Sequence, residues 1–122
     1  MRNPDDAPET RPAILPGTLD LVILGTLAGG PEHGHGIVLA ILARSRDVLL
    51  VDHGSLYPAL QRLEKKNWIR ASWGVSGNNR RARFYELTRA GRKQLDREIG
   101  EWRALSAAVD RLLAPALIAA RS

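Results

Sequence analysis

The sequence contains no cysteine and no long apolar run. Without cysteine the chain has no disulfide framework and no thiolate chemistry, which suits a reducing compartment. No stretch approaches the ~20 apolar residues that a membrane span needs. The opening MRNPDDAPETRPAILPG also lacks the apolar core of a signal peptide. We therefore expect a soluble cytoplasmic protein with no membrane partner.

Motifs for catalysis and cofactor binding are also missing. The sequence has no glycine-rich phosphate loop and no paired carboxylate motif, and no general base is placed beside Ser55. We expect no enzymatic activity and no cofactor. His33 and His35, with His53 as a distant third ligand, would suit a small metal or ligand sensor. Because no cysteine or acidic residue completes the ligand set, we expect no metal.

Acidic residues are scarce in one third of the chain. The net charge is +5, and residues 52–87 hold seven basic and three acidic residues, a local surplus of +4. A basic patch confined in this way is expected for a polyanion such as nucleic acid. Charge alone would also suit an acidic protein or an anionic membrane surface.

The first third of the chain predicts a tail and a helix. At 122 residues the chain fits one domain with a modest core. Residues 1–16 hold four prolines, which predicts a mobile tail. Thr18 can cap a helix through TLDLVILGTLA, which the following Gly-Gly-Pro ends. This helix is apolar on nearly all sides, so more than one neighbour has to cover it. A second subunit is one candidate, with contacts at Leu19, Val22 and Ile23.

Two further helices are expected before residue 68. HGIVLAILARS, residues 35–45, has helical spacing of its apolar residues, and DVLLV, residues 47–51, reads as a short edge strand or an extended connection. The third helix lies in GSLYPALQRLEKKNW. Its apolar positions recur at intervals of three and four residues, which puts them on one face: Leu56, Ala59, Leu60 and Leu63.

Pro58 is compatible with two different starting points for the third helix. If Gly54 or Ser55 is the N-cap, Pro58 falls in or just after the first turn, where its missing N–H costs little. If the helix already begins at Asp52, Pro58 lies deeper and should kink it.

A hairpin and a long helix complete the chain. WIRASW and RRARFYEL alternate in the manner of strands around GVSGNN, a loop of turn-forming residues. Thr88 can cap a last helix of roughly 40 Å, which we expect to end at Ala114, before Pro115. Its apolar residues follow the spacing of a coiled-coil seam, which predicts pairing with a second copy through Leu95, Ile99, Trp102, Ser106, Val109 and Leu113.

Three helices followed by a basic hairpin are typical of a winged helix-turn-helix, in which the third helix enters the major groove of DNA. The predicted fold class is therefore mainly α with a small β-hairpin and one long C-terminal dimerisation helix. We divide the chain into a tail (1–16), a DNA-binding domain (17–87), a dimerisation helix (88–114) and a second tail (115–122). A protein-interaction module with the same fold and an acidic partner is the alternative.

Two stretches at this separation resemble a known family. GSLYPALQRLEKKNWI followed by RRARFYELTRAGRKQL is similar to the signature of the PadR family of bacterial transcriptional regulators, and TLDLVILGTLAGGPEHGHGI resembles its first helices. The single last helix resembles the shorter subfamily. The resemblance implies a homodimeric repressor bound to a palindromic operator. It implies DNA contacts at Ser55, Tyr57, Pro58, Gln61, Arg62 and Lys65 on the third helix and at Arg80, Arg81 and Arg83 on the wing.

Trp102 suggests an effector site. An indole at a seam position is usually core, but two copies of the last helix could bring two indoles together across a cavity that suits flat aromatic ligands. Relatives in the shorter subfamily resemble this arrangement. Trp102 is therefore a candidate site for a small aromatic effector, and packing of the indole in the seam is the alternative.

Overall fold

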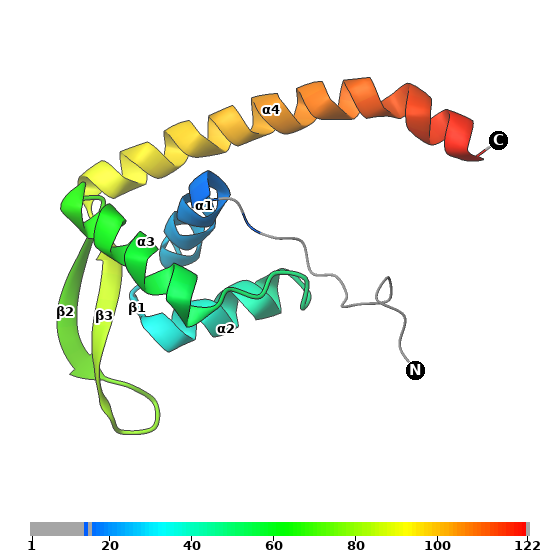
Figure 1. The fold of residues 1–122 in the computed structure, drawn as a ribbon. Coiled ribbons are helices and arrows are strands. Elements are labelled where there is room, and N and C mark those ends of the chain that lie inside the picture. The colour runs from blue at the N-terminus through cyan, green and yellow to red at the C-terminus, as the bar shows by residue number, and fades with distance from the viewer. Residues whose placement is uncertain (1–13, 15, 122) are drawn as a thin grey trace, which may run out of the picture.

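The computed structural model describes residues 14 and 16–121, so the predicted tail lies outside the described residues except at its end. Four helices and the hairpin follow one another in the expected order, and a short additional strand between the first two helices makes the sheet three-stranded (Figure 1). The predicted fold class is confirmed. The elements are α1 (Pro16–Leu27), β1 (Glu32–His33), α2 (Gly34–Arg44), α3 (His53–Lys65), β2 (Ile69–Val75), β3 (Arg81–Leu87) and α4 (Arg89–Arg121).

Helix α1 is the centre of the core. It contacts α2, α3, α4 and β3, so this chain's own elements cover most of its apolar surface. Ile23 and Leu24 are fully buried, and Leu19 is 5% exposed. The helix begins at Pro16, so Thr18 lies inside it and the predicted Thr18 cap is wrong. It ends before Gly30, whose φ of +133° suits glycine.

Helix α2 begins beside a strand that the sequence pattern did not predict. His33 is the N-cap, and its Nδ1 accepts a hydrogen bond of 3.2 Å from the Gly36 amide. Glu32 and His33 also form β1, which pairs antiparallel with β3. Two residues are too few to show strand alternation. The DVLLV segment forms no strand: Asp47 belongs to the turn after α2, with a φ of 64°, and the rest is an irregular connection that buries Val51.

Helix α3 begins at His53, two residues earlier than a Gly54 cap and three residues earlier than a Ser55 cap would place its start. Asp52 is the N-cap, and its Oδ1 accepts a 2.7 Å hydrogen bond from the Ser55 amide. Pro58 is therefore the sixth helical residue, and the carbonyl of Gly54 lacks its usual donor. The helix nonetheless continues to Lys65 and buries the predicted residues Leu56, Ala59, Leu60 and Leu63.

The predicted hairpin is confirmed, with its loop shifted. Strands β2 and β3 pair from Ile69 with Leu87 to Val75 with Arg81, which leaves residues 76–80 as the loop. The Ser76 amide donates to the Arg80 carbonyl at 2.8 Å and closes this loop. Figure 1 shows the hairpin, which we call the wing, extending past the helices.

A tight joint connects the wing to α4. Thr88 caps α4 as predicted, because its Oγ1 accepts from the Gly91 amide at 2.9 Å. The same hydroxyl donates to the Asn67 carbonyl at 2.6 Å, and the Thr88 amide donates to the Trp68 carbonyl at 3.0 Å. A Cβ at Gly91 would lie 1.8 Å from the Trp68 carbonyl oxygen, so only glycine allows this close approach.

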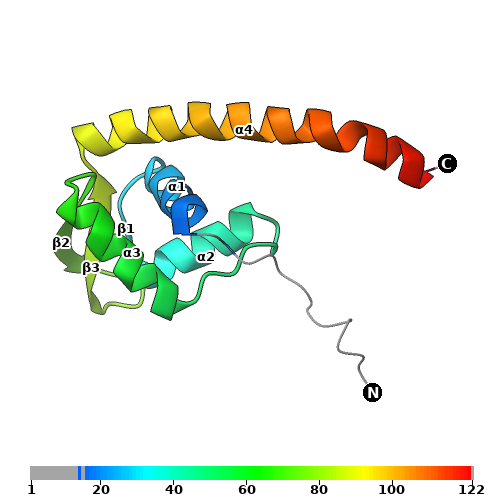
Figure 2. The same ribbon diagram turned by 45° about the horizontal axis from the view of Figure 1, so that its top comes forward.

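Helix α4 is longer than predicted. It passes through Pro115 and continues to Arg121, so both the expected end at Ala114 and a separate tail from residue 115 are wrong. Proline removes one hydrogen bond, to the Arg111 carbonyl, and water can replace it because this part of α4 is exposed. At 1.5 Å per residue the helix spans roughly 50 Å. Its C-terminal half projects beyond the domain in both views (Figures 1 and 2).

Among residues 14 and 16–121, no helix has both the length and the apolar character that crossing a membrane requires.

Candidate DNA-binding surface

The outward side of α3 carries all the helical residues that the resemblance implies for DNA contact. The fold divides the helix into two sides, because one side packs on α1, α2 and β2. Tyr57 is 43% exposed and lies over Gly34 of α2, where a Cβ would approach its hydroxyl to 2.6 Å. The exposed set is Ser55, Tyr57, Pro58, Gln61, Arg62 and Lys65.

Two of the predicted arginines are already paired within the chain. Arg62 Nη2 lies 2.9 Å from Asp20 Oδ1, and Arg83 Nη2 lies 2.9 Å from Glu64 Oε2. Both arginine side chains are about half exposed, and exposed pairs of this kind contribute only about 0–1 kcal/mol. These pairs hold the guanidinium groups in place and can give way to a phosphate.

The other two wing arginines have no acidic partner among the described residues. Arg80 lies at the end of the wing loop, and Arg81 begins β3. The Arg81 guanidinium carbon lies 4.7 Å from the centre of the Trp73 ring. Two unpaired cations at the free end of the hairpin favour an anionic partner there.

A cleft of about 380 Å³ separates the start of α3 from the wing. Its lining includes the three wing arginines and the aromatic side chains Tyr57, Trp73 and Tyr85, and no acidic residue lines it. Burial raises the pKa of the Tyr85 hydroxyl above its ordinary value of 10.0, although Arg83 nearby lowers it. At neutral pH the cleft therefore offers cations and neutral rings to a ligand.

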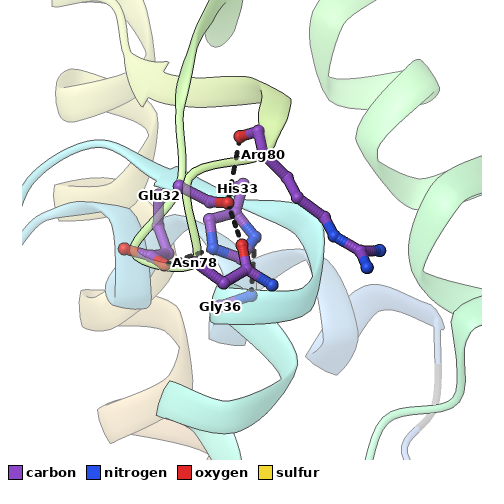
Figure 3. Close-up of polar contacts among 6 residues, drawn as sticks. Glu32, His33, Gly36, Asn78 and Arg80 are labelled. Carbon is purple, nitrogen blue, oxygen red and sulfur yellow. Dashed lines mark hydrogen bonds and ion pairs between the residues drawn. The ribbon is translucent and has the colours of Figure 1, made fainter.

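His33 and His35 line this cleft, and all three histidines have an intramolecular contact. Figure 3 shows His33 between Glu32, 3.6 Å away, and the Gly36 amide that it caps. His35 stacks on His53 with ring centres 5.6 Å apart, and His53 stacks on Tyr57 at 6.0 Å. Within the described part of the chain, no three His, Cys, Asp or Glu side chains are grouped as metal ligands.

The wing loop faces the start of α2 across the same cleft. In Figure 3 Asn78 and Arg80 lie near His33, and the Arg80 guanidinium extends away from the loop. The Ser76 hydroxyl lies 2.5 Å from Asn78 Oδ1 and 3.0 Å from the Arg80 carbonyl, which orders this turn. The loop therefore presents Arg80 on a defined backbone.

The sequence pattern did not single out Trp73 and Asn78 as lining residues. The signal for Trp73 was present, because strand alternation from Ile69 places Ala71 and Trp73 on the same face as the wing arginines. Asn78 had no such signal, since its position depends on the conformation of the loop.

The predicted seam on α4 divides into two parts. Leu95 is 5% exposed and, like Leu19 and Ile23 of α1, belongs to the chain's own core. These three residues leave almost no surface in the single chain for the predicted contact with a second subunit. Val22, Ile99 and Ser106 are partly buried. Farther along α4 the seam is open, with exposed fractions of 47%, 41% and 48% at Trp102, Val109 and Leu113.

Three helices, a basic hairpin beside the third, and a helix whose outward side is polar define a winged helix-turn-helix protein. The sequence profile of the Transcriptional regulator PadR-like family matches residues 23–97. The chain belongs to this family. It is therefore a DNA-binding transcriptional regulator and not an enzyme.

Solved structures agree with this assignment, and the chain also resembles a sequence relative. A PadR-like transcriptional regulator from Bacillus cereus is 26% identical, with a TM-score of 0.71 over 82% of this chain and 95% of its own. A PadR family transcription regulator from Clostridium difficile is 29% identical, with a TM-score of 0.66 over 78% of this chain and 97% of its own. The "Uncharacterized protein X" of Lysinibacillus sphaericus is 29% identical over 82% of this chain and 92% of its own length.

Proposed function

We propose that the chain is a homodimeric repressor that binds an inverted-repeat operator through α3 and the wing. The observation that carries this proposal is the cleft beside α3, which three arginines line without any acidic residue. A duplex would bring phosphates to the wing while the outward side of α3 enters the major groove. Gln61 and Ser55 would then reach base edges, and Arg62, Lys65 and the wing arginines would neutralise phosphates.

The proposed dimer rests on the open part of α4. Trp102, Val109 and Leu113 lie on one side of the helix and are 41–48% exposed in the single chain. With Ser106 included, these residues follow one another at intervals of four, three and four, which are those of a two-helix seam. The helix lies on the side of the domain away from the free end of the wing, so pairing there leaves both DNA-facing surfaces open (Figure 1).

A two-fold dimer predicts a two-fold operator. Its two α3 helices would enter successive major grooves about 34 Å apart. The test is a gel-shift series in which the protein binds a duplex selected from a random-sequence pool, at several salt concentrations. We expect an inverted repeat and an affinity that falls steeply with salt, because phosphate contacts release counterions. Binding that ignores sequence and salt would contradict the proposal.

We further propose that a flat aromatic compound binds between the two copies of Trp102 and releases the operator. A ligand can act only by preferring one separation of the two α3 helices over another. In a Trp68→Phe, Trp73→Phe variant, Trp102 is the sole emitter. Its fluorescence should change with planar aromatic compounds in the variant dimer, and an unchanged spectrum across a broad panel would rule this effector site out.

A further inference from the structure

Trp73 on the wing is a large apolar side chain that the fold leaves in water. It is 63% exposed, whereas Trp68 is partly buried against the core. Trp73 pairs across the hairpin with Arg83, and the Arg81 guanidinium lies over its ring. An indole contributes most to folding when it is buried, so the fold gains little from this one. Its exposure points to a role outside the chain.

One face of the wing changes character along its length. Near α4 the face is core, because Ile69 is 1% exposed and pairs with Leu87. Toward the loop the same face leaves the core and becomes aromatic and cationic. Its residues there are Trp73 and Val75 on β2 and Arg81 and Arg83 on β3.

The backbone holds this face in position. The residue between Trp73 and Val75 is Gly74, where a Cβ would lie 2.8 Å from the Phe84 ring. Phe84 packs edge-on against His33 of β1, with ring centres 5.4 Å apart. The far side of the wing is therefore braced against β1, and Trp73 is presented on the side of the cleft.

The chemistry of the cleft selects a ligand that is anionic and has flat or apolar parts. Arg80 and Arg81 supply cations without acidic partners, and Trp73 supplies an open aromatic surface. A nucleic acid strand combines these features, since each unit has a phosphate, a sugar and a base. The grooves of B-DNA alternate along its surface, so a hairpin beside a helix in the major groove reaches the adjacent minor groove.

We propose that Trp73, held by Arg81, enters the minor groove that flanks each half-site and packs against sugars or bases there. The inference rests on the proposed function and adds to it a wing contact that senses the shape and flexibility of flanking DNA. Arg81 neutralises a phosphate, whereas Trp73 contributes apolar contact. Their effects on the salt dependence of binding should therefore differ.

The test compares wing variants on one duplex, selected from a random pool by the wild-type chain. Trp73→Ala should weaken binding by about tenfold for each wing, and so about a hundredfold for the dimer, as expected when one aromatic contact with DNA is lost at each half-site, while the slope of log affinity against log salt stays unchanged. Trp73→Phe should retain part of the DNA affinity that Trp73→Ala loses. Arg81→Ala should instead reduce the magnitude of that slope by about two, because one cation is removed from each of the two wings of the dimer.

Two direct measurements locate the contact. Hydroxyl-radical footprinting should show sugars protected beside each half-site by the wild-type chain and unprotected with Trp73→Ala. With Trp68 and Trp102 changed to Phe, the fluorescence of Trp73 should become shielded from acrylamide when the duplex binds. With Trp102 as the sole emitter, which serves as the matched control, the duplex should give no such shielding.

The outcomes separate the two proposals. If the wild-type chain binds no selected duplex, the proposed function fails and this inference fails with it. If it binds but Trp73→Ala binds equally well and Trp73 stays open to acrylamide, only the inference fails. If benzoate shields Trp73 while Trp73→Ala leaves DNA affinity intact, the cleft is a small-anion site and the inference is likewise wrong.

Discussion

Replacing Gly91 with alanine should destabilise the protein, although alanine is the better helix former. A Cβ at this position would lie 1.8 Å from the Trp68 carbonyl oxygen and 2.7 Å from its carbon. Real contacts of this kind are essentially never under 3.0 Å, so α4 has to move away by more than about 1 Å. That movement strains the two hydrogen bonds that join Thr88 to Asn67 and Trp68, between α3 and the wing, and the cap bond from the Gly91 amide to Thr88.

The size of the destabilisation caused by Gly91→Ala follows from opposing contributions. Overpacking costs about 1–3 kcal/mol, and each hydrogen bond lost at Thr88 costs roughly 1 kcal/mol more. Alanine in place of glycine inside a helix stabilises the folded state by about 1 kcal/mol. We expect a net loss of about 2 kcal/mol for Gly91→Ala. Gly100 on the same helix has no atom within 4 Å of the position that an added Cβ would take, so Gly100→Ala should gain up to about 1 kcal/mol.

Urea denaturation followed by circular dichroism measures both variants against the wild type. The series is run at several protein concentrations, because association raises apparent stability by mass action. The opposite signs of the two substitutions are the test. If Gly91→Ala proves neutral or stabilising, as Gly100→Ala should be, the close approach of α4 to Trp68 is not a feature of the folded protein.

Three further predictions concern other parts of the chain. Asp52→Ala should lower stability by about 1 kcal/mol in the same denaturation assay, because it removes the α3 cap, while Asp52→Asn should retain most of it. Val109→Asp with Leu113→Asp should give a monomer in sedimentation, whereas Ala107→Asp, on the opposite side of α4, should leave association unchanged. The raised pKa of Tyr85 means that the folded chain holds this proton more tightly than the unfolded chain. Its contribution to stability is present below about pH 10 and is lost as pH rises through the raised pKa, so Tyr85→Phe should flatten the alkaline decline in the urea midpoint.

Regular periodicity made most of the fold predictable. The four apolar residues of α3 recur at helical intervals, and all are buried. The hairpin was marked by alternation on both sides of a turn-rich loop, and Thr88 was identifiable as a cap from its residue type and place. These signals are local, so the sequence carries them without knowledge of the tertiary structure.

The features that the sequence did not predict correctly depend on tertiary structure. Strand β1 exists because β3 offers it a partner, and two residues carry no pattern of their own. Proline predicts a helix end, yet α4 continues past Pro115 in an exposed part of the helix. Apolar spacing could not distinguish Leu95, which the chain's own core buries, from Val109, which stays open. The cleft combines three separate elements, so only the exposed residues of α3 and the wing could be named in advance.

The joint at Thr88 also fixes how motion at one end of α4 reaches the wing. A tilt of α4 that carries this joint with it acts through a lever of roughly 50 Å. Displacing its far end by 1 Å turns the base of the wing by only about 1°, whereas the same displacement at Trp102, about 20 Å from the joint, turns it by about 3°. A push of given size therefore changes the angle of the wing most when it is applied close to the domain, and the distal turns of α4 can pack tightly against a partner with little effect on that angle.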